Sequence, residues 1–360
     1  MTADQRPHAG CETRTWYLDL LRILASFGVV FLHTSPFDLS ACTVSSVQWK
    51  TATGLNILFR WCVPVFFMIS GALYLSAHHA FSIRKLYRKS ILRLAVSFAF
   101  WSALYAAAHC IIMGKGKWTF LNQFLRGHYH MWFIFSIFGL YLLTPLIRCI
   151  TQSKKNTEYA LVLGFIYTFL FPLIFSLILL FDFPHADVVR SFQSMVTQTT
   201  PLSGVSLLYY YILGHYLNEY VLKKPIRCIV YVSGAAGLVL TMILTFFHSE
   251  SIGSTSAQYY DPSSATVMLT ASAIFLLFRQ AFAGVSFCGR PARMLLAISA
   301  CSYGVYLVHP FVIEHVLPVF AADPAAMLAV KPLASLAVYA AALFIILLIR
   351  RIPLIGKLIA

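Results

Sequence analysis

Long uninterrupted apolar runs are the feature that most constrains how this chain folds. A helix needs about 20 apolar residues to cross the ~30 Å hydrocarbon core of a bilayer. Because backbone groups in lipid must pair within the protein, only helices and closed barrels can span it. The runs are continuous rather than alternating, which predicts an all-α bundle. We place ten spanning helices at 17–36, 54–76, 91–113, 130–147, 159–181, 202–221, 228–247, 265–284, 294–316 and 328–349.

Composition supports a membrane protein over a soluble one. Charged residues make up 11% of the chain, against about 25% in a typical soluble domain. The net charge of +15 does not indicate nucleic-acid binding, because the basic residues lie between the apolar runs, as a membrane topology requires. The eight cysteines include no CxxC pair, and we therefore expect neither a metal site nor a disulfide framework.

The distribution of lysine and arginine predicts the orientation. If the N-terminus is cytoplasmic, 19 of the 27 basic residues fall in cytoplasmic segments and 6 in outer segments. The remaining two, Arg22 and Arg60, lie within helices. Cytoplasmic loops are enriched in basic residues, so both termini are expected in the cytoplasm. Miscounting one helix would spoil this asymmetry, which supports an even number of spans.

The chain divides into a membrane domain and two short tails. Residues 1–16 are polar and form an expected cytoplasmic tail, residues 17–350 the membrane domain, and residues 351–360 a second cytoplasmic tail. The first apolar run lacks the cleavage site of a signal peptide and is interpreted as a spanning helix. The loops are too short to hold a separate domain.

The first span carries two polar groups that are costly in lipid. Arg22 and His33 are eleven residues apart, which places both on one helix face about 16 Å apart along the axis. Such a stripe suggests a polar channel through the bundle. Alternatively, Arg22 pairs with Asp19 or snorkels to the interface, and His33 is a structural residue.

Three other helices carry candidate site residues. Arg60 lies about two turns inside the second span with no local acid, and His309 precedes a proline near the outer end of the ninth. A proline break frees backbone groups that can line a cavity. His128 and His130 are two residues apart and should point in different directions on a helix, which disfavours a metal pair.

The loop between the second and third spans is basic. Arg84 and Arg88 are among its cations, and they either enforce topology or attract the phosphates of an anionic donor. Trp132 lies where an aromatic belt is expected, near the outer end of the fourth span.

Five segments resemble the membrane acyltransferase-3 family, and together they extend over nearly the whole chain. The first is an arginine followed by ten residues and a histidine in the first span, here Arg22 and His33. The others are Pro64-Val-Phe-Phe-Met-Ile-Ser-Gly71, His130-Met-Trp-Phe133 with Leu140-Tyr-Leu-Leu-Thr-Pro145, Tyr210-Tyr-Ile-Leu-Gly214, and Ser302-Tyr-Gly-Val-Tyr-Leu-Val-His-Pro310. Any one of them is weak evidence, but all five in order are specific.

The resemblance implies a membrane O-acyltransferase, and especially an enzyme that O-acetylates bacterial surface glycans such as the enterobacterial common antigen. It implies acetyl-CoA or another acyl-CoA as cytoplasmic co-substrate and a cell-surface or lipid-linked glycan as acceptor. His33 and His309 would be catalytic, with His33 a general base or an acyl carrier. The donor would be bound by Arg22, Arg60, Arg84 and Arg88, and the acceptor by His130, Trp132 and Tyr306.

Two functions of other classes remain open on the residues alone. A transporter or flippase for an anionic or glycan substrate would also use many helices and a basic interior. Transporters often have paired halves with matching broken helices, and no such pairing is evident in this sequence. A membrane-embedded sensor that binds a ligand without turnover is the second alternative.

Overall fold

The computed structural model describes residues 14–34, 43–76, 81–181, 202–315, 324–353 and 356–360, together with positions 188, 191 and 194. All regular secondary structure in these residues is helical. The elements are α1 (Trp16–His33), α2 (Val47–Ile57), α3 (Cys62–Tyr74), α4 (Ile83–Lys85), η1 (Leu86–Ile91), α5 (Leu92–Met113), α6 (Lys117–Arg126), η2 (Tyr129–Met131), α7 (Trp132–Thr151), α8 (Lys154–Phe165), η3 (Ile166–Leu170), α9 (Phe171–Leu180), α11 (Leu202–Glu219), α12 (Lys224–Ile252), α13 (Ala265–Ala281), α14 (Gly289–His315), α15 (Pro324–Ile349) and α16 (Gly356–Ile359).

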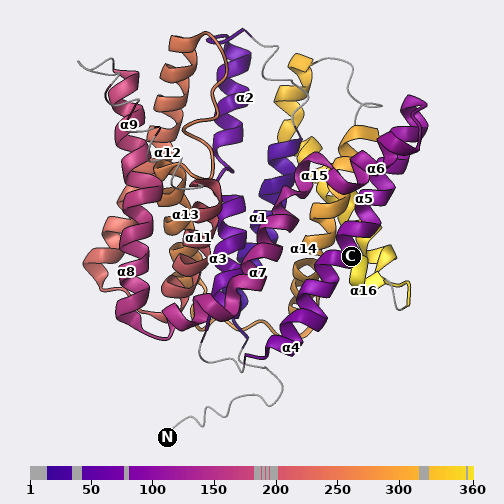
Figure 1. Ribbon diagram of the computed structural model, residues 1–360, viewed down its shortest axis with the longest axis horizontal. Coiled ribbons are helices and arrows are strands. Elements are labelled where there is room, and N and C mark those ends of the chain that lie inside the picture. Colours follow the sequence, from indigo (N-terminus) through magenta and orange to yellow (C-terminus); the bar gives the residue numbers. More distant parts are fainter. Residues whose placement is uncertain are drawn as a thin grey trace, which may run out of the picture.

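The predicted membrane bundle is confirmed within these ranges. Each of the ten predicted apolar runs contains a helix. Eight helical segments are long and apolar enough to cross a membrane, and the ninth apolar helix, α13, is shorter. Figure 1 shows the helices side by side, with α1 and α3 in the middle of the bundle. The chain is therefore an all-helical, multi-pass membrane protein, while the side on which its termini lie remains a prediction.

The second predicted span, 54–76, is not one helix. α2 ends at Ile57, and α3 begins at Cys62. Pro64 has no N–H to donate to the carbonyl of Arg60, and its ring clashes with that carbonyl in a regular helix. The chain instead forms tight turns, in which the Arg60 amide donates to the Ile57 carbonyl at 3.2 Å. Arg60 therefore lies in a helix break rather than inside a helix.

The closest helix contact joins α3 and α11 through glycines. A Cβ added to Gly71 would overlap the Tyr211 carbonyl, and one added to Gly214 would overlap the Met68 carbonyl. Small residues let helix backbones approach closely in membrane proteins. The glycine that ends the Pro64–Gly71 segment is therefore required by the close approach of α11.

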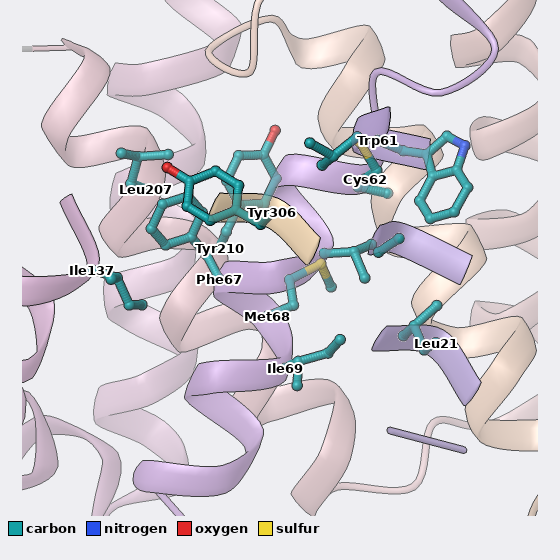
Figure 2. Close-up of a cluster of buried hydrophobic side chains, with 14 of the residues drawn as sticks. Leu21, Trp61, Cys62, Phe67, Met68, Ile69, Ile137, Leu207, Tyr210 and Tyr306 are labelled. Carbon is teal, nitrogen blue, oxygen red and sulfur yellow. The ribbon is translucent and has the colours of Figure 1, made fainter. Parts of the chain in front are cut away.

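Buried apolar side chains on both sides of this contact form the core. Figure 2 shows Phe67, Met68 and Ile69 of α3 among Leu21 of α1 and Leu207 and Tyr210 of α11. Phe67, Met68 and Tyr210 are fully buried. The core fixes α1 and α3 against each other, and these two helices supply much of the site described below.

Three sequence expectations change in the structure. Lys331, which the charge count assigns to an outer segment, is buried within α15. Cys288 is disulfide-bonded, which cysteine spacing alone did not reveal. Residues 356–359 of the expected C-terminal tail form α16, which packs against α5, where the Trp101 indole donates to the Ile359 carbonyl at 2.7 Å. Residues 1–13 of the expected N-terminal tail lie outside the described residues.

Candidate active site

One cavity of about 330 Å³ runs along α1 between two chemically different ends. Its first end, called here the basic end, contains Arg22, Lys89 and Arg93. Its second end, called the histidine end, contains His33, His130 and Trp132. The walls between the two ends are mainly apolar and aromatic, and they include Val29, Leu32, Val63, Phe66, Ile69, Leu73, Leu94, Phe133, Ile137, Tyr141 and Tyr303.

Helical geometry explains why α1 contributes to both ends. Arg22 and His33 both line the cavity, as expected for residues on one helix face. Eleven residues at 1.5 Å each separate them by about 16 Å along the axis. The polar stripe predicted on the first span therefore lines the cavity along its length.

Arg22 is held in place by neighbours at the N-terminal end of α1. Its Nη1 lies 3.4 Å from a carboxylate oxygen of Asp19, as the local-pairing alternative predicts, and donates to Ser299 Oγ at 3.2 Å. Ser299 in turn donates to Asp19 at 2.6 Å. Pairing with Asp19 and lining the cavity are thus compatible, because the guanidinium has five donors.

His33 and His309 form a hydrogen-bonded pair at the histidine end. His33 Nδ1 and His309 Nε2 are 2.8 Å apart, and the planes of the two rings are nearly parallel, at 11° to each other. His309 is completely buried behind His33 and does not itself line the cavity. The sequence left the partner of His33 unnamed, and the structure identifies it as this second histidine.

The proline after His309 explains the arrangement of protons in the pair. Pro310 cannot donate to the Tyr306 carbonyl four residues earlier, which frees that oxygen. His309 Nδ1 lies 2.8 Å from it. A carbonyl only accepts, so Nδ1 carries the hydrogen, and Nε2 of the neutral ring accepts from His33 Nδ1–H. His33 Nε2 is then left with its lone pair at the cavity.

A second group of histidines lies beside this pair. His128 and His130 face each other with their Nδ1 atoms 3.0 Å apart, contrary to the expectation that they diverge. His128 precedes the 3-10 turn η2 and His130 lies within it, and a 3-10 turn sets a different angle between them from a regular α-helix. His128 Nε2 lies 3.3 Å from Glu314. No group of three or more metal-ligand side chains occurs among the described residues.

His130 is 2% exposed, and its Nε2 makes no hydrogen bond to the part of the chain that the structure describes. The Leu307 carbonyl is its neighbour but lies outside hydrogen-bonding geometry. Tyr306 donates its hydroxyl to the His130 carbonyl at 2.6 Å and lines the same cavity. Trp132 is 45% exposed. The three residues predicted to bind the acceptor sugar therefore line the same cavity.

A second, wider pocket of about 600 Å³ adjoins the basic end. Arg84 and Arg88, both predicted from the sequence, line it, and Lys89 and Arg93 belong to both cavities. Arg93 is positioned by a 2.5 Å hydrogen bond to the Ala360 carbonyl and by the Tyr303 ring, 5.2 Å from its guanidinium carbon. The two cavities together form an electropositive entrance to an apolar passage.

Sequence reasoning placed some residues better than others. Arg60 does not line the cavity, and the structure places it at the break between α2 and α3. Lys89 and Arg93 were seen only as part of a basic loop. Their spacing of four residues, one helix turn, at the start of the third span was the signal that could have placed them on one face.

Comparison with known proteins agrees with this geometry. A protein-family model described as "Acyltransferase domain", that of the acyltransferase-3 family, matches residues 15–351. No protein of curated function and no solved structure matches the chain. The matched range contains every residue of the cavity and excludes only parts of the two tails. The chain therefore belongs to the acyltransferase-3 family and is a membrane-bound acyltransferase.

Proposed function

We propose that this enzyme transfers an acetyl group from cytoplasmic acetyl-CoA to a hydroxyl of a cell-surface or lipid-linked glycan, in the cytoplasmic membrane. The observation that supports this proposal most is the single cavity that joins a cluster of cations to the His33–His309 pair. Acyl-CoA has the matching distribution of chemistry, with phosphates at one end, a largely uncharged arm, and the reactive thioester at the other.

The cations of the basic pocket and the length of the cavity suggest how acyl-CoA would bind. The phosphates of CoA would bind the pocket lined by Arg84, Arg88 and Lys89, since phosphate oxygens accept charge-assisted hydrogen bonds from such groups. Arg22 and Arg93 would contact the start of the arm at the basic end. The arm would then follow α1 for about 16 Å and bring the thioester to His33, a distance that an extended arm can span.

His33 is the proposed general base. Its Nε2 takes the proton of the acceptor hydroxyl, and the oxygen attacks the thioester carbonyl carbon. The tetrahedral intermediate collapses as the C–S bond breaks, and the proton returns from His33 to the departing CoA thiolate. His309 acts as a positioning residue, because it accepts the His33 Nδ1 hydrogen and stabilises the imidazolium. In the alternative, His33 itself carries the acetyl group between two such steps.

Groups at the histidine end would complete the reaction centre. A tetrahedral intermediate needs hydrogen-bond donors aimed at its oxyanion. His130 and Trp132 both line this end, and their ring N–H groups are the proposed donors. Tyr306, whose hydroxyl is bonded to the His130 carbonyl, keeps that segment in place. The acceptor sugar would approach from the outer side.

The test is transfer of labelled acetyl from acetyl-CoA to envelope glycans by the full chain in nanodiscs. We expect His33→Ala to lose at least about 100-fold in rate, the lower range for a positioned acid–base group. His315→Ala on α14 is the matched control, because His315 lies outside the cavity. Unchanged transfer by His33→Ala would refute the proposal. Label trapped on wild-type protein, and absent from His33→Ala, would indicate the acyl-carrier route.

A further inference from the structure

Lys331 of α15 is a buried cation that has no carboxylate partner among the residues that the structure describes. Its side chain is 1% exposed, and its Nζ makes no hydrogen bond to any described residue. Its Nζ lies 4.8 Å from the centroid of the Phe31 ring. Burying an ammonium without an acceptor is costly, which makes Lys331 a candidate for pairing with an anionic ligand.

Arg60 supplies a second positive charge nearby. Its Nε donates to Asn56 at 2.6 Å, and its guanidinium lies 4.0 Å from the centroid of the Tyr260 ring. Its charge acts on Lys331 by repulsion. Asp261 attracts Arg60, but it is not within ion-pair distance. Among the described residues, neither cation has a carboxylate partner within 4.0 Å, although two like charges that repel each other particularly require one.

Both cations contact the last turn of α1, which ends at His33, either directly or through one intervening residue. Lys331 lies over Phe31, and Arg60 is bonded to Asn56, whose amide donates to the Leu32 carbonyl at 3.3 Å. The charge of Arg60 also acts on His33 itself. Neither residue lines the cavity proposed for the donor. The two cations therefore lie beside the reaction centre but apart from the donor path.

We propose that Arg60 and Lys331 bind an anionic group of the acceptor, a phosphate ester or a carboxylate next to the hydroxyl that His33 deprotonates. This inference rests on the proposed function, and it names the acceptor as an anionic glycan rather than a neutral one. Lipid-linked sugar phosphates and acidic sugars share this chemistry. Arginine suits the planar, two-point recognition of such anions, and lysine supplies a point charge.

The experiment uses the full chain in nanodiscs of zwitterionic phosphatidylcholine with saturating CoA, which occupies the phosphate sites of the donor. The probes are pyrophosphate, glucose 1-phosphate, glucuronate and, as the neutral control, glucose. We expect at least one anion, and not glucose, to raise the melting temperature. Lys331→Met and Arg60→Gln should each weaken that anion's affinity at least tenfold. Phosphate and carboxylate probes distinguish the two sources, and anionic lipid added to the nanodiscs tests a headgroup as occupant.

A structural lysine and a ligand-binding lysine give opposite results in this design. Without anion, Lys331→Met should melt at or above the wild-type temperature, because it removes a buried unpaired charge. Lower stability of Lys331→Met together with no response to any anion would overturn the inference, and so would stabilisation by the lipid headgroup alone. Acetyl-CoA binding is measured in parallel. If the wild-type protein does not bind acetyl-CoA, the proposed function is contradicted. If it binds acetyl-CoA but no anion has an effect, only the present inference is contradicted.

Discussion

His309→Ala is the most informative perturbation of the proposed mechanism. It removes the acceptor of His33 Nδ1–H, an interaction of 2.8 Å that becomes charge-assisted when His33 takes a proton. Hydrogen bonds to charged groups contribute about 1.5–3 kcal/mol. At about 1.36 kcal/mol per factor of ten, we expect the turnover rate to fall about 10- to 150-fold. The effect should appear in kcat rather than in the KM for acetyl-CoA, because His309 does not line the donor cavity.

The assay is acetyl transfer in nanodiscs, with acetyl-CoA binding and protein level measured on the same samples. His309→Gln is the matched variant, because its amide oxygen can still accept from His33 Nδ1–H. It should recover part of the lost rate. If His309→Ala retains the wild-type rate within twofold, or if glutamine recovers nothing while both variants fold, the assignment of His309 as a positioning residue is incorrect.

Three further predictions test other parts of the structure. Pro310→Ala restores a backbone amide that competes with His309 for the Tyr306 carbonyl. We expect kcat to fall several-fold while the melting temperature stays the same or rises. A lower melting temperature with unchanged kcat would contradict this. Lys89→Ala should raise the KM for acetyl-CoA about tenfold, the effect of losing roughly 1.4 kcal/mol of binding free energy. The change in kcat should be smaller. A change in kcat alone would show that Lys89 does not bind the donor. Gly214→Ala forces a Cβ into a backbone carbonyl and should cost about 1–3 kcal/mol in thermal unfolding, whereas Gly139→Ala, which meets open space, should be neutral and serves as its control.

If the basic pocket binds the donor as proposed, ionic strength should affect donor binding but not the His33–His309 pair. Its cations are near the surface of the bundle, and salt screens exposed charges with a Debye length of about 10 Å at 0.1 M. The His33–His309 contact is buried and is screened much less. A rise in KM with salt at constant kcat is therefore expected from kinetics at two ionic strengths.

The spans and the α1 stripe could be predicted because their causes are local. Lipid requires about 20 continuous apolar residues from every spanning helix, whatever its neighbours are. Within one helix the pitch fixes relative directions, so the face shared by Arg22 and His33 follows from their spacing alone. The break in backbone hydrogen bonding at Pro310 could also be predicted, because proline lacks an N–H wherever it occurs. Only the structure showed that His309 uses the carbonyl that is freed.

Contacts between helices were beyond the reach of the sequence. His33 and His309 are separated by 276 positions, and nothing in either segment encodes their distance. The burial of Lys331 and the absence of Arg60 from the lining of the cavity along α1 likewise depend on how each helix is rotated and how deep it lies. The sequence by itself determined that the chain forms a bundle of apolar helices and which residues share a face of one helix. Tertiary structure decided which faces meet, because rotation and depth are set by the fit of complementary surfaces, as at the glycine contact between α3 and α11, and not by any repeat within one helix.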